Sequence, residues 1–284
     1  MNQLFDKFAE YLLINCKYTN STIAAYKLDI RKFLEYLKIS NTNDLKRITR
    51  ERVTDFLDNL GEKYSEYTVS RSLTSIKKYF EFLKVERIIE ENNIKGIPSK
   101  IIPVKAPLTI SEEVIRKVID GIDAKSQDGL RDKAIIDVLF STGVKASELI
   151  NLQIGNYDSV NMSLSIKENE KKIRYLRLNS QAIPNLNKYL SLVRRDVVEK
   201  TGSTEEAIFI GRYGRKITRN WVWKIVDQRF VEAGLKAKIT PQVLRNSFAE
   251  NALKRGMDIG IIQEALGHTR KHITNRKYVY TKRK

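Results

Sequence analysis

The sequence has very few of the residues that form disulfides or zinc sites. It contains one cysteine, Cys16, and two histidines among 284 residues. A disulfide joins two cysteines, and a structural zinc ion is usually held by four cysteine or histidine side chains. We therefore expect no disulfide framework and no metal site.

Long apolar runs and a cleavable leader are also missing. No stretch approaches the roughly 18 apolar residues that suggest a membrane-spanning helix. The first residues, MNQLFDKFAEYLL, carry an early acidic side chain and lack the apolar core of a signal peptide. These absences predict a cytoplasmic protein with no membrane segment.

Acidic residues are outnumbered: 34 Asp and Glu face 52 Lys and Arg, which gives a net charge of +18. Such an excess does not determine the fold, but it attracts polyanions. Nucleic acid is the first candidate partner, because neutralising phosphates releases counterions and drives binding. An anionic membrane surface is the second. The length suits two domains, and 42% apolar residues suffice for real cores.

The first hundred residues predict four amphipathic helices, since apolar side chains recur there at helical spacing. Asn20 or Ser21 is expected to cap the second helix, and Thr49 the third, which Gly61 ends. The fourth helix begins near Ser65. Short connections between amphipathic helices predict a small bundle.

Cations lie on the other faces of this fourth helix. Arg71, Lys77 and Lys78 alternate there with small hydroxyl side chains. Long cations contact phosphates, and small hydroxyls allow a close approach to base edges, which suits a helix in the major groove of DNA. An ordinary solvated face has the same pattern, so both interpretations stay open.

A change in composition divides the chain. Residues 91–107 contain three prolines, one glycine and no helical pattern. We place a linker at 94–107, between a domain at 1–93 and a second domain at 108–284.

The second domain is predicted to be mostly helical with a small β-sheet. Thr109 or Ser111 caps its first helix, and Gly143 ends the next one. A short helix follows in ASELINL. Alternating residues then predict strands at 163–166 and 173–178, with KENEKK as the polar turn between them. More helices follow, so the fold class is mainly α.

Cutting DNA without a metal sets three chemical requirements. The non-bridging oxygens must be neutralised, a nucleophile activated and the leaving oxygen protonated. Arginine grips two phosphate oxygens, histidine or lysine donates a proton, and tyrosine attacks where cations favour its phenolate. The second domain holds these residue types in STGVKASELINL, a lysine-bearing hairpin, TPQVLRNSFA and LGHTRKHITNRKYVY.

These phrases, in this order, resemble the tyrosine recombinase (phage integrase) family, most closely its Xer-like members. The corresponding family phrases are TGxRxSEL, a lysine-bearing hairpin, HxLRH, and LGH followed by a tyrosine. The first hundred residues are similar to the family's helical core-binding domain, so the resemblance covers nearly the whole chain. It implies a four-helix, SAM-like core-binding domain and a mostly helical catalytic domain with a small β-sheet.

The resemblance also implies roles for matching residues. Arg245 corresponds to the arginine that clamps the scissile phosphate, and His268 to the histidine that supports phosphate binding and proton transfer. Lys167 is our choice for the hairpin lysine that protonates the leaving 5′ oxygen. Tyr278 corresponds to the nucleophile, which forms a 3′-phosphotyrosine bond. No metal and no cofactor are implied.

Three catalytic positions depart from the family pattern. Lys145 stands at the first arginine position, where it keeps the charge but loses the two-pronged grip. Gln242 replaces the first histidine of HxLRH, so it can donate a hydrogen bond but cannot transfer a proton. Asn246 replaces the second. A DNA-binding protein of the same fold with weak or no catalysis therefore stays open.

Further alternatives concern the hairpin and the C-terminus. Lys171 and Lys172 compete with Lys167 because the predicted turn is long. Tyr280 competes with Tyr278 because the spacing from LGH exceeds the family's by one residue. Many family members also continue into a helix that docks on a neighbouring subunit. Only six residues follow Tyr278, so we expect either that this helix is absent or that the native protein is longer.

The implied function is site-specific recombination through a 3′-phosphotyrosine intermediate and a Holliday junction. The implied partner is double-stranded DNA with inverted half-sites, bound by a homodimer and brought together by a homotetramer. Arg219, after a glycine-bearing loop, and Lys271, among C-terminal cations, are further predicted DNA contacts. A plain transcription regulator would leave the C-terminal residues unexplained.

Overall fold

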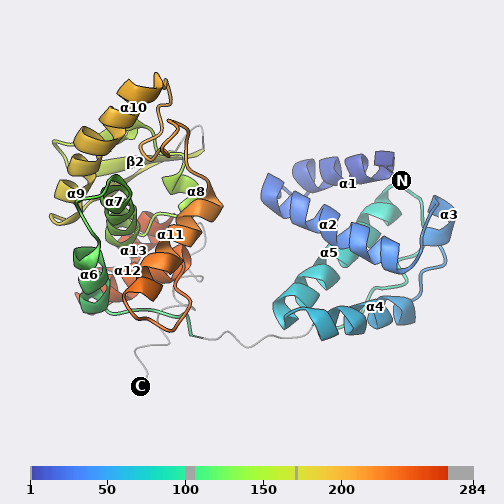
Figure 1. The fold of residues 1–284 in the computed structure, drawn as a ribbon. Coiled ribbons are helices and arrows are strands. Elements are labelled where there is room, and N and C mark those ends of the chain that lie inside the picture. The colour runs from blue at the N-terminus through green and yellow to red at the C-terminus, as the bar shows by residue number, and fades with distance from the viewer. Residues whose placement is uncertain (1, 100–105, 170–171, 268–284) are drawn as a thin grey trace. The chain divides into compact units, whose positions relative to one another are not determined.

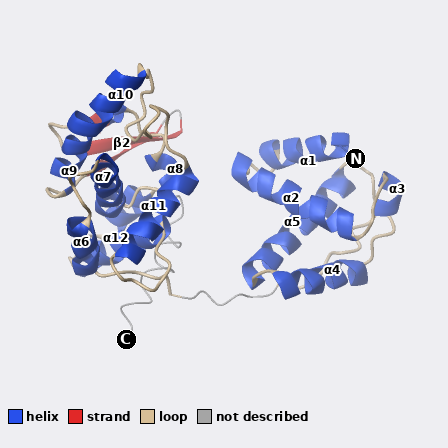
Figure 2. Ribbon diagram, in the orientation of Figure 1, coloured by secondary structure: helices blue, strands red, loops and turns tan. Residues whose placement is uncertain are grey.

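The structure is a computed structural model that describes residues 2–99, 106–169 and 172–267. The chain divides into two compact units, Met1–Pro103 and Val104–Lys284 (Figure 1). Helices dominate both units, and the strands belong to the second (Figure 2). No helix in the described ranges has the length and apolarity needed to cross a membrane.

The first unit is a bundle of four long helices with one short helix added. Its elements are α1 (Asn2–Ile14), α2 (Asn20–Tyr36), α3 (Thr42–Leu45), α4 (Arg50–Lys63) and α5 (Glu66–Val85). Helix α5 packs against α1, α2 and α4. Phe8, Tyr79 and Phe82 meet at its centre, with the Phe8 and Tyr79 rings edge to face at 5.1 Å. The four helices predicted from apolar spacing are confirmed.

Two of the predicted helix ends in this unit are wrong. Thr19, rather than Asn20 or Ser21, is the N-cap of α2, and its hydroxyl accepts the backbone N–H of Thr22 at 3.4 Å. Gly61 lies inside α4, which continues to Lys63. A single glycine costs a helix only about 1 kcal/mol, so it did not end this one.

The first core extends beyond the helices into the segment expected to be linker. Ile94 is fully buried and Ile97 is 7% exposed, and both pack in the core of the first unit. The first unit therefore continues past residue 93.

The second unit surrounds a central buried helix, α7, which contacts α6, α9, α11 and α12. Its elements in chain order are α6 (Glu112–Gly121), α7 (Gln127–Thr142), α8 (Ala146–Leu149), η1 (Ile154–Asn156), β1 (Tyr157–Asp158), β2 (Ser163–Asn169), β3 (Lys172–Arg177), α9 (Ala182–Lys188), the π-helical turn η2 (Tyr189–Arg194), α10 (Arg195–Thr201), α11 (Arg219–Glu232), α12 (Pro241–Lys254) and α13 (Ile259–Leu266).

Helix termini in this unit follow local chemistry. Ser111 rather than Thr109 caps α6, because its hydroxyl accepts the backbone N–H of Val114. Gly143 ends α7 in the left-handed conformation, with φ of 64°, as predicted.

The sheet is antiparallel with the order β1-β2-β3. Leu164 pairs with Leu176 and Ile166 with Arg174, and these four side chains are buried on what we call the inner face of the hairpin. The prediction that KENEKK forms the turn is wrong in its extent, because β2 continues to Asn169 and β3 already begins at Lys172. Polar side chains are compatible with a strand when its backbone finds a partner.

Candidate active site

Arg245 lies inside the second unit, in the first half of α12. The side chain of Thr240 caps this helix by accepting the backbone N–H of Val243. Arg245 is 3% exposed. Its Nη1 donates to the carbonyl oxygen of Gly143 and its Nη2 to that of Leu266, each at 2.5 Å. This buried cation therefore connects the end of α7 with the end of α13.

Lys145 is the N-cap residue of α8. Its backbone N–H donates to Glu148 Oε2 at 2.9 Å, and its Nζ lies 3.5 Å from Glu148 Oε1. The Lys145 side chain is 45% exposed, whereas that of Glu148 is 18% exposed. The ammonium group is thus anchored on one side and accessible on the other.

Arg174 is a buried residue of the candidate site that the motifs of the sequence did not single out. Its side chain is 2% exposed on the inner face of the hairpin. Nη2 donates to Glu148 Oε2 at 2.7 Å, and Nη1 lies 3.1 Å from Glu148 Oε1 and 3.3 Å from Glu168 Oε1. Nε donates to the carbonyl oxygen of Ala265 at 3.1 Å. A sequence signal was present, because Arg174 occupies an inward position in the alternating strand IRYLRL, where an apolar residue is expected.

Five side chains form a row of alternating charge, which we call the ion-pair chain: Lys145, Glu148, Arg174, Glu168 and Lys172. Lys172 Nζ closes the row at 3.0 Å from Glu168 Oε2. Adjacent members lie within ion-pair distance throughout. The chain joins α8, β2 and β3, and the Arg174–Ala265 bond adds α13.

The carboxylates of this chain are held in the charged form. Burial alone raises the pKa of Glu148, but hydrogen bonds from Arg174 and from the backbone of Lys145, with their positive charges, lower the pKa overall. The pKa of Glu168 is lowered in the same way: burial opposes the shift, and Lys172 and Arg174 outweigh it. Both carboxylates are therefore anionic partners for the three cations at neutral pH.

The predicted hairpin lysine, Lys167, lies away from this chain. It pairs across the hairpin with Ile173, and both are exposed on the outer face. Lys172, a competing candidate, reaches the inner-face carboxylate Glu168 instead. Lys171 lies outside the described residues.

Gln242 stands in the first turn of α12, three residues before Arg245. It is exposed, and its Nε2 donates to Asn246 Oδ1 at 2.9 Å. The amide of Asn246 lies 3.4 Å from the carbonyl oxygen of Leu108. The two residues that replace the family's histidines therefore bind each other.

The described cations predicted to contact DNA differ in their partners. Arg71 donates from Nε and Nη2 to the two carboxylate oxygens of buried Asp29, at 3.0 and 2.8 Å. Lys77 donates to Ser99 Oγ, and Lys78 to Glu81 Oε2. Arg219 is the exposed first residue of α11. The remaining predicted residues lie outside the described part of the chain: His268, Lys271, Tyr278 and Tyr280.

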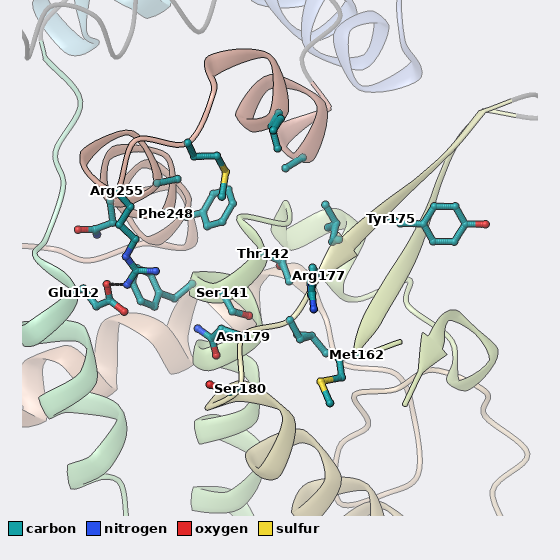
Figure 3. A pocket seen from close by; sticks show the side chains of 18 of the residues that line it. Glu112, Ser141, Thr142, Met162, Tyr175, Arg177, Asn179, Ser180, Phe248 and Arg255 are labelled. Atoms are coloured by element: carbon teal, nitrogen blue, oxygen red, sulfur yellow. Dashed lines mark hydrogen bonds and ion pairs between the residues drawn. The ribbon is translucent and has the colours of Figure 1, made fainter. Parts of the chain in front are cut away.

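A pocket of about 530 Å³ lies beside the site but contains none of the predicted site residues. Figure 3 shows its lining from the ends of α7 and β3 and from α12 and α13, with Thr142, Arg177 and Phe248 labelled. An ion pair between Glu112 and Arg255 closes one side (Figure 3). This pocket beside α13 is therefore distinct from the ion-pair chain, although Ala265 borders both.

Family models match both units of the chain. The model described as phage integrase family matches residues 109–284, and that of the phage integrase N-terminal SAM-like domain matches residues 5–87. The chain belongs to the phage integrase family. Its members supply the context for the geometry above.

Curated relatives and solved structures agree with this assignment. The tyrosine recombinase XerC of Roseiflexus castenholzii is 30% identical over 271 residues, which cover 95% of this chain and 86% of the relative. The tyrosine recombinase XerD of Oceanobacillus iheyensis is 31% identical, covering 93% of this chain and 89% of the relative. This phage integrase is thus a tyrosine recombinase of the Xer type, an enzyme that transfers DNA strands.

Two solved structures share the fold. The XerH site-specific recombinase bound to a palindromic difH substrate superposes with a TM-score of 0.76 at 24% identity, covering 92% of this chain and 76% of XerH. A lambda integrase dimer bound to a core site gives 0.72 at 14% identity, covering 98% and 94%. The mainly helical fold with a small sheet is confirmed.

Two buried arginines of the candidate site bind the backbone at the end of α13. Arg245 binds the carbonyl of Leu266, and Arg174 binds that of Ala265. Gly267 follows in the left-handed conformation. His268 comes next in the sequence, so two buried arginines fix the backbone from which the LGH histidine extends.

Proposed function

We propose that this recombinase cuts and rejoins DNA at specific sites through a 3′-phosphotyrosine intermediate and a Holliday junction. The observation that carries the proposal is the attachment of Arg245 and the ion-pair chain to the two carbonyls that precede Gly267 and His268. Tyr278 follows ten residues after this histidine in the sequence. This attachment supports the proposal that the nucleophile is Tyr278, which follows this backbone in the sequence.

In the proposed step, the phenolate oxygen of Tyr278 attacks the scissile phosphorus. The bond from phosphorus to the 5′ oxygen breaks, and its electron pair stays on that oxygen, which takes a proton from a hairpin lysine. Arg245 and Lys145 offset the charge on the non-bridging oxygens. Gln242 donates a hydrogen bond to phosphate, and His268 supports binding and proton transfer.

The sequence offers three candidates for the hairpin lysine, and the geometry separates two of them. Lys172 belongs to the ion-pair chain, whereas Lys167 lies on the outer face. This difference favours Lys172 over Lys167 as the proton donor, and Lys171 remains a third candidate.

The proposal extends to partners. XerH is solved on a palindromic DNA, and lambda integrase as a dimer on a core site. By analogy, we propose that a homodimer of this chain binds inverted half-sites of double-stranded DNA in the cytoplasm, and that two dimers form a tetramer. Its proposed DNA contacts are Arg71, Lys77, Lys78, Arg219 and Lys271.

A second candidate function is DNA binding in the same fold with weak or no cleavage. Lys145 favours it, because one ammonium group replaces the fork that holds two phosphate oxygens. Gln242 favours it as well, because an amide cannot supply a proton.

One experiment separates the two functions. A duplex is first selected by the wild-type protein from a pool of random-sequence DNA, and a nicked suicide substrate is built on it. We expect the wild type to give a covalent protein–DNA complex on a denaturing gel. Tyr278→Phe should abolish this complex, and Tyr280→Phe should leave it. Tight binding without a complex contradicts cleavage, and loss with Tyr280→Phe alone moves the nucleophile to that residue.

A further inference from the structure

Arg174 is the one member of the ion-pair chain that contacts both carboxylates. Its Nη1 and Nη2 face Glu148, and Nη1 also faces Glu168. The chain thus has two arms that share a single buried guanidinium. One arm ends at Lys145 on α8, and the other ends at Lys172 on β3.

We propose that Arg174 is a positioning residue that sets two lysines of the active site, Lys145 through Glu148 and Lys172 through Glu168. The inference rests on the proposed function, because it assumes that both lysines act on the scissile phosphate. The inference goes beyond that function because it gives the two arms different chemical roles.

The two lysines need a partner that positions their ammonium groups. A lysine ends in a compact charge on a flexible four-carbon stem, so its position is defined only where a counter-charge holds it. Lys145 and Lys172 have side chains that are 45% and 58% exposed. Their stems are therefore not fixed by packing, and the carboxylates are what locate their ammonium groups.

The carboxylates in turn require Arg174. The side chains of Glu148 and Glu168 are 18% and 14% exposed, and a partly buried carboxylate without a cation loses much of its stabilisation. Arg174 supplies the shared positive charge. Its planar group also directs donors to three separate acceptors, which a lysine at this position could not do.

The third acceptor of Arg174 fixes the position of the ion-pair chain relative to α13. Nε donates to the carbonyl oxygen of Ala265, next to Leu266, whose carbonyl accepts from Arg245. The positions of both arms are therefore fixed relative to the same backbone segment that Arg245 binds. A displaced hairpin would move Lys172 relative to the phosphate clamp.

The two arms act on different atoms. Lys145 offsets charge on the non-bridging oxygens, which is needed whatever group leaves. Lys172 gives its proton to the 5′ oxygen as the bond to phosphorus breaks. If sulfur replaces that bridging oxygen, the group leaves as a thiolate of low basicity and needs no proton.

The test compares two suicide substrates of the selected duplex, one with the 5′ oxygen and one with 5′ sulfur at the scissile bond. Rates of covalent complex formation are measured at saturating full-length protein. Glu168→Gln should slow the oxygen substrate about 10- to 100-fold and the sulfur substrate less than about threefold, because it interrupts only the proton-donor arm. Glu148→Gln should slow both substrates by similar factors.

Arg174→Lys should slow both substrates, and the oxygen substrate more. Arg177→Lys is the matched control, since it makes the same change three residues along β3, at an exposed position on the outer face, and it should alter both rates less than about twofold. Thermal unfolding of each variant checks the fold. Should Arg174→Lys unfold, the contrast between Glu168→Gln and Glu148→Gln still decides.

The outcomes separate the two levels of the hypothesis. A wild type that forms no complex on either substrate overturns the proposed function and this inference together. A wild type that forms the complex, with equal oxygen-to-sulfur ratios for Glu168→Gln and Glu148→Gln, overturns this inference alone. So does an Arg174→Lys variant that behaves like Arg177→Lys.

Discussion

At the scale of single residues, a charged side chain in this protein often has a partner distant in sequence. Arg71 was predicted to face DNA because it lies among hydroxyls and cations on one helix. In the structure it also holds Asp29 on α2, a carboxylate that is 2% exposed and contacts Ser75 Oγ. A local pattern identifies an exposed cation, but only the packing of two helices shows what it binds within the molecule.

Arg71→Gln should lower the free energy of unfolding of the first unit by about 1–3 kcal/mol, because it leaves Asp29 buried with little compensation. The value is below that for a fully buried pair, since the Arg71 side chain is 46% exposed. Urea denaturation of the full chain, followed by circular dichroism, measures it. Lys77→Gln, which among the described contacts loses a bond to Ser99, is the control and should change stability by less than about 0.5 kcal/mol. Equal stability of the two variants would show that Arg71 has no structural role.

Arg174 and Lys167 show the same limit in the candidate site. Strand alternation was sufficient to assign Ile173–Leu178 to a strand, yet its phase also put a cation among apolar inward positions. That phase predicts a buried ion pair, and the carboxylates that complete it come from α8 and β2. Lys167 follows the opposite phase, so its outward position could have been predicted from Ile166.

At the scale of elements, helices were predicted better than their ends and turns. Apolar periodicity is set by many residues, whereas an end depends on one or two local hydrogen bonds, as at Thr19. The predicted strands of the hairpin were too short because KENEKK is polar, whereas in the structure cross-strand hydrogen bonds continue into this segment. Gly143 was predicted correctly, since a glycine after the last apolar turn can take positive φ.

Gly143→Ala tests how the C-terminus of α7 contributes to the packing of the site. Both Gly143 and Gly202 end helices at φ of 64°, so alanine is strained equally by backbone conformation at both, by about 1 kcal/mol. At Gly143 the added Cβ would also lie 2.5 Å from Phe248 Cδ1 and 2.9 Å from Leu266 Cδ2, whereas at Gly202 nothing lies within 4 Å. We expect Gly143→Ala to cost the second unit at least about 1 kcal/mol more than Gly202→Ala.

Thermal unfolding of both alanine variants measures this difference. Gly143→Ala should also slow covalent complex formation, because the carbonyl of Gly143 accepts from Arg245 and Leu266 carries its other acceptor. Equal unfolding temperatures for Gly143→Ala and Gly202→Ala would contradict the packing argument.

At the scale of the whole molecule, two mainly helical units with separate cores were predictable from composition, periodicity and the proline-rich segment. The extent of the first unit was not. Ile94 and Ile97 stand among prolines and polar residues without a period, so nothing local shows that they are buried. Both belong to the same core cluster as side chains from the helices of the first unit.

The net charge of +18 makes a prediction about both units together. If each unit contacts phosphates of one duplex, the logarithm of the binding constant should fall linearly with the logarithm of salt concentration. Each lost phosphate contact should reduce the steepness by about 0.9. Lys77→Gln in the first unit and Arg219→Gln in the second should each produce this change, and the double variant about 1.8, because distant contacts add.

Fluorescence anisotropy with the selected duplex at several salt concentrations measures these slopes. Glu62→Gln is the control for a general effect of net charge. Glu62 is exposed on α4, and its replacement changes the net charge in the opposite direction, so the steepness should stay unchanged. A Lys77→Gln slope equal to that of the wild type would mean that this lysine makes no phosphate contact. Its described partner is the neutral Ser99 hydroxyl, and no carboxylate of the described residues lies within ion-pair distance of it, so a phosphate is the partner that we expect to neutralise its ammonium charge.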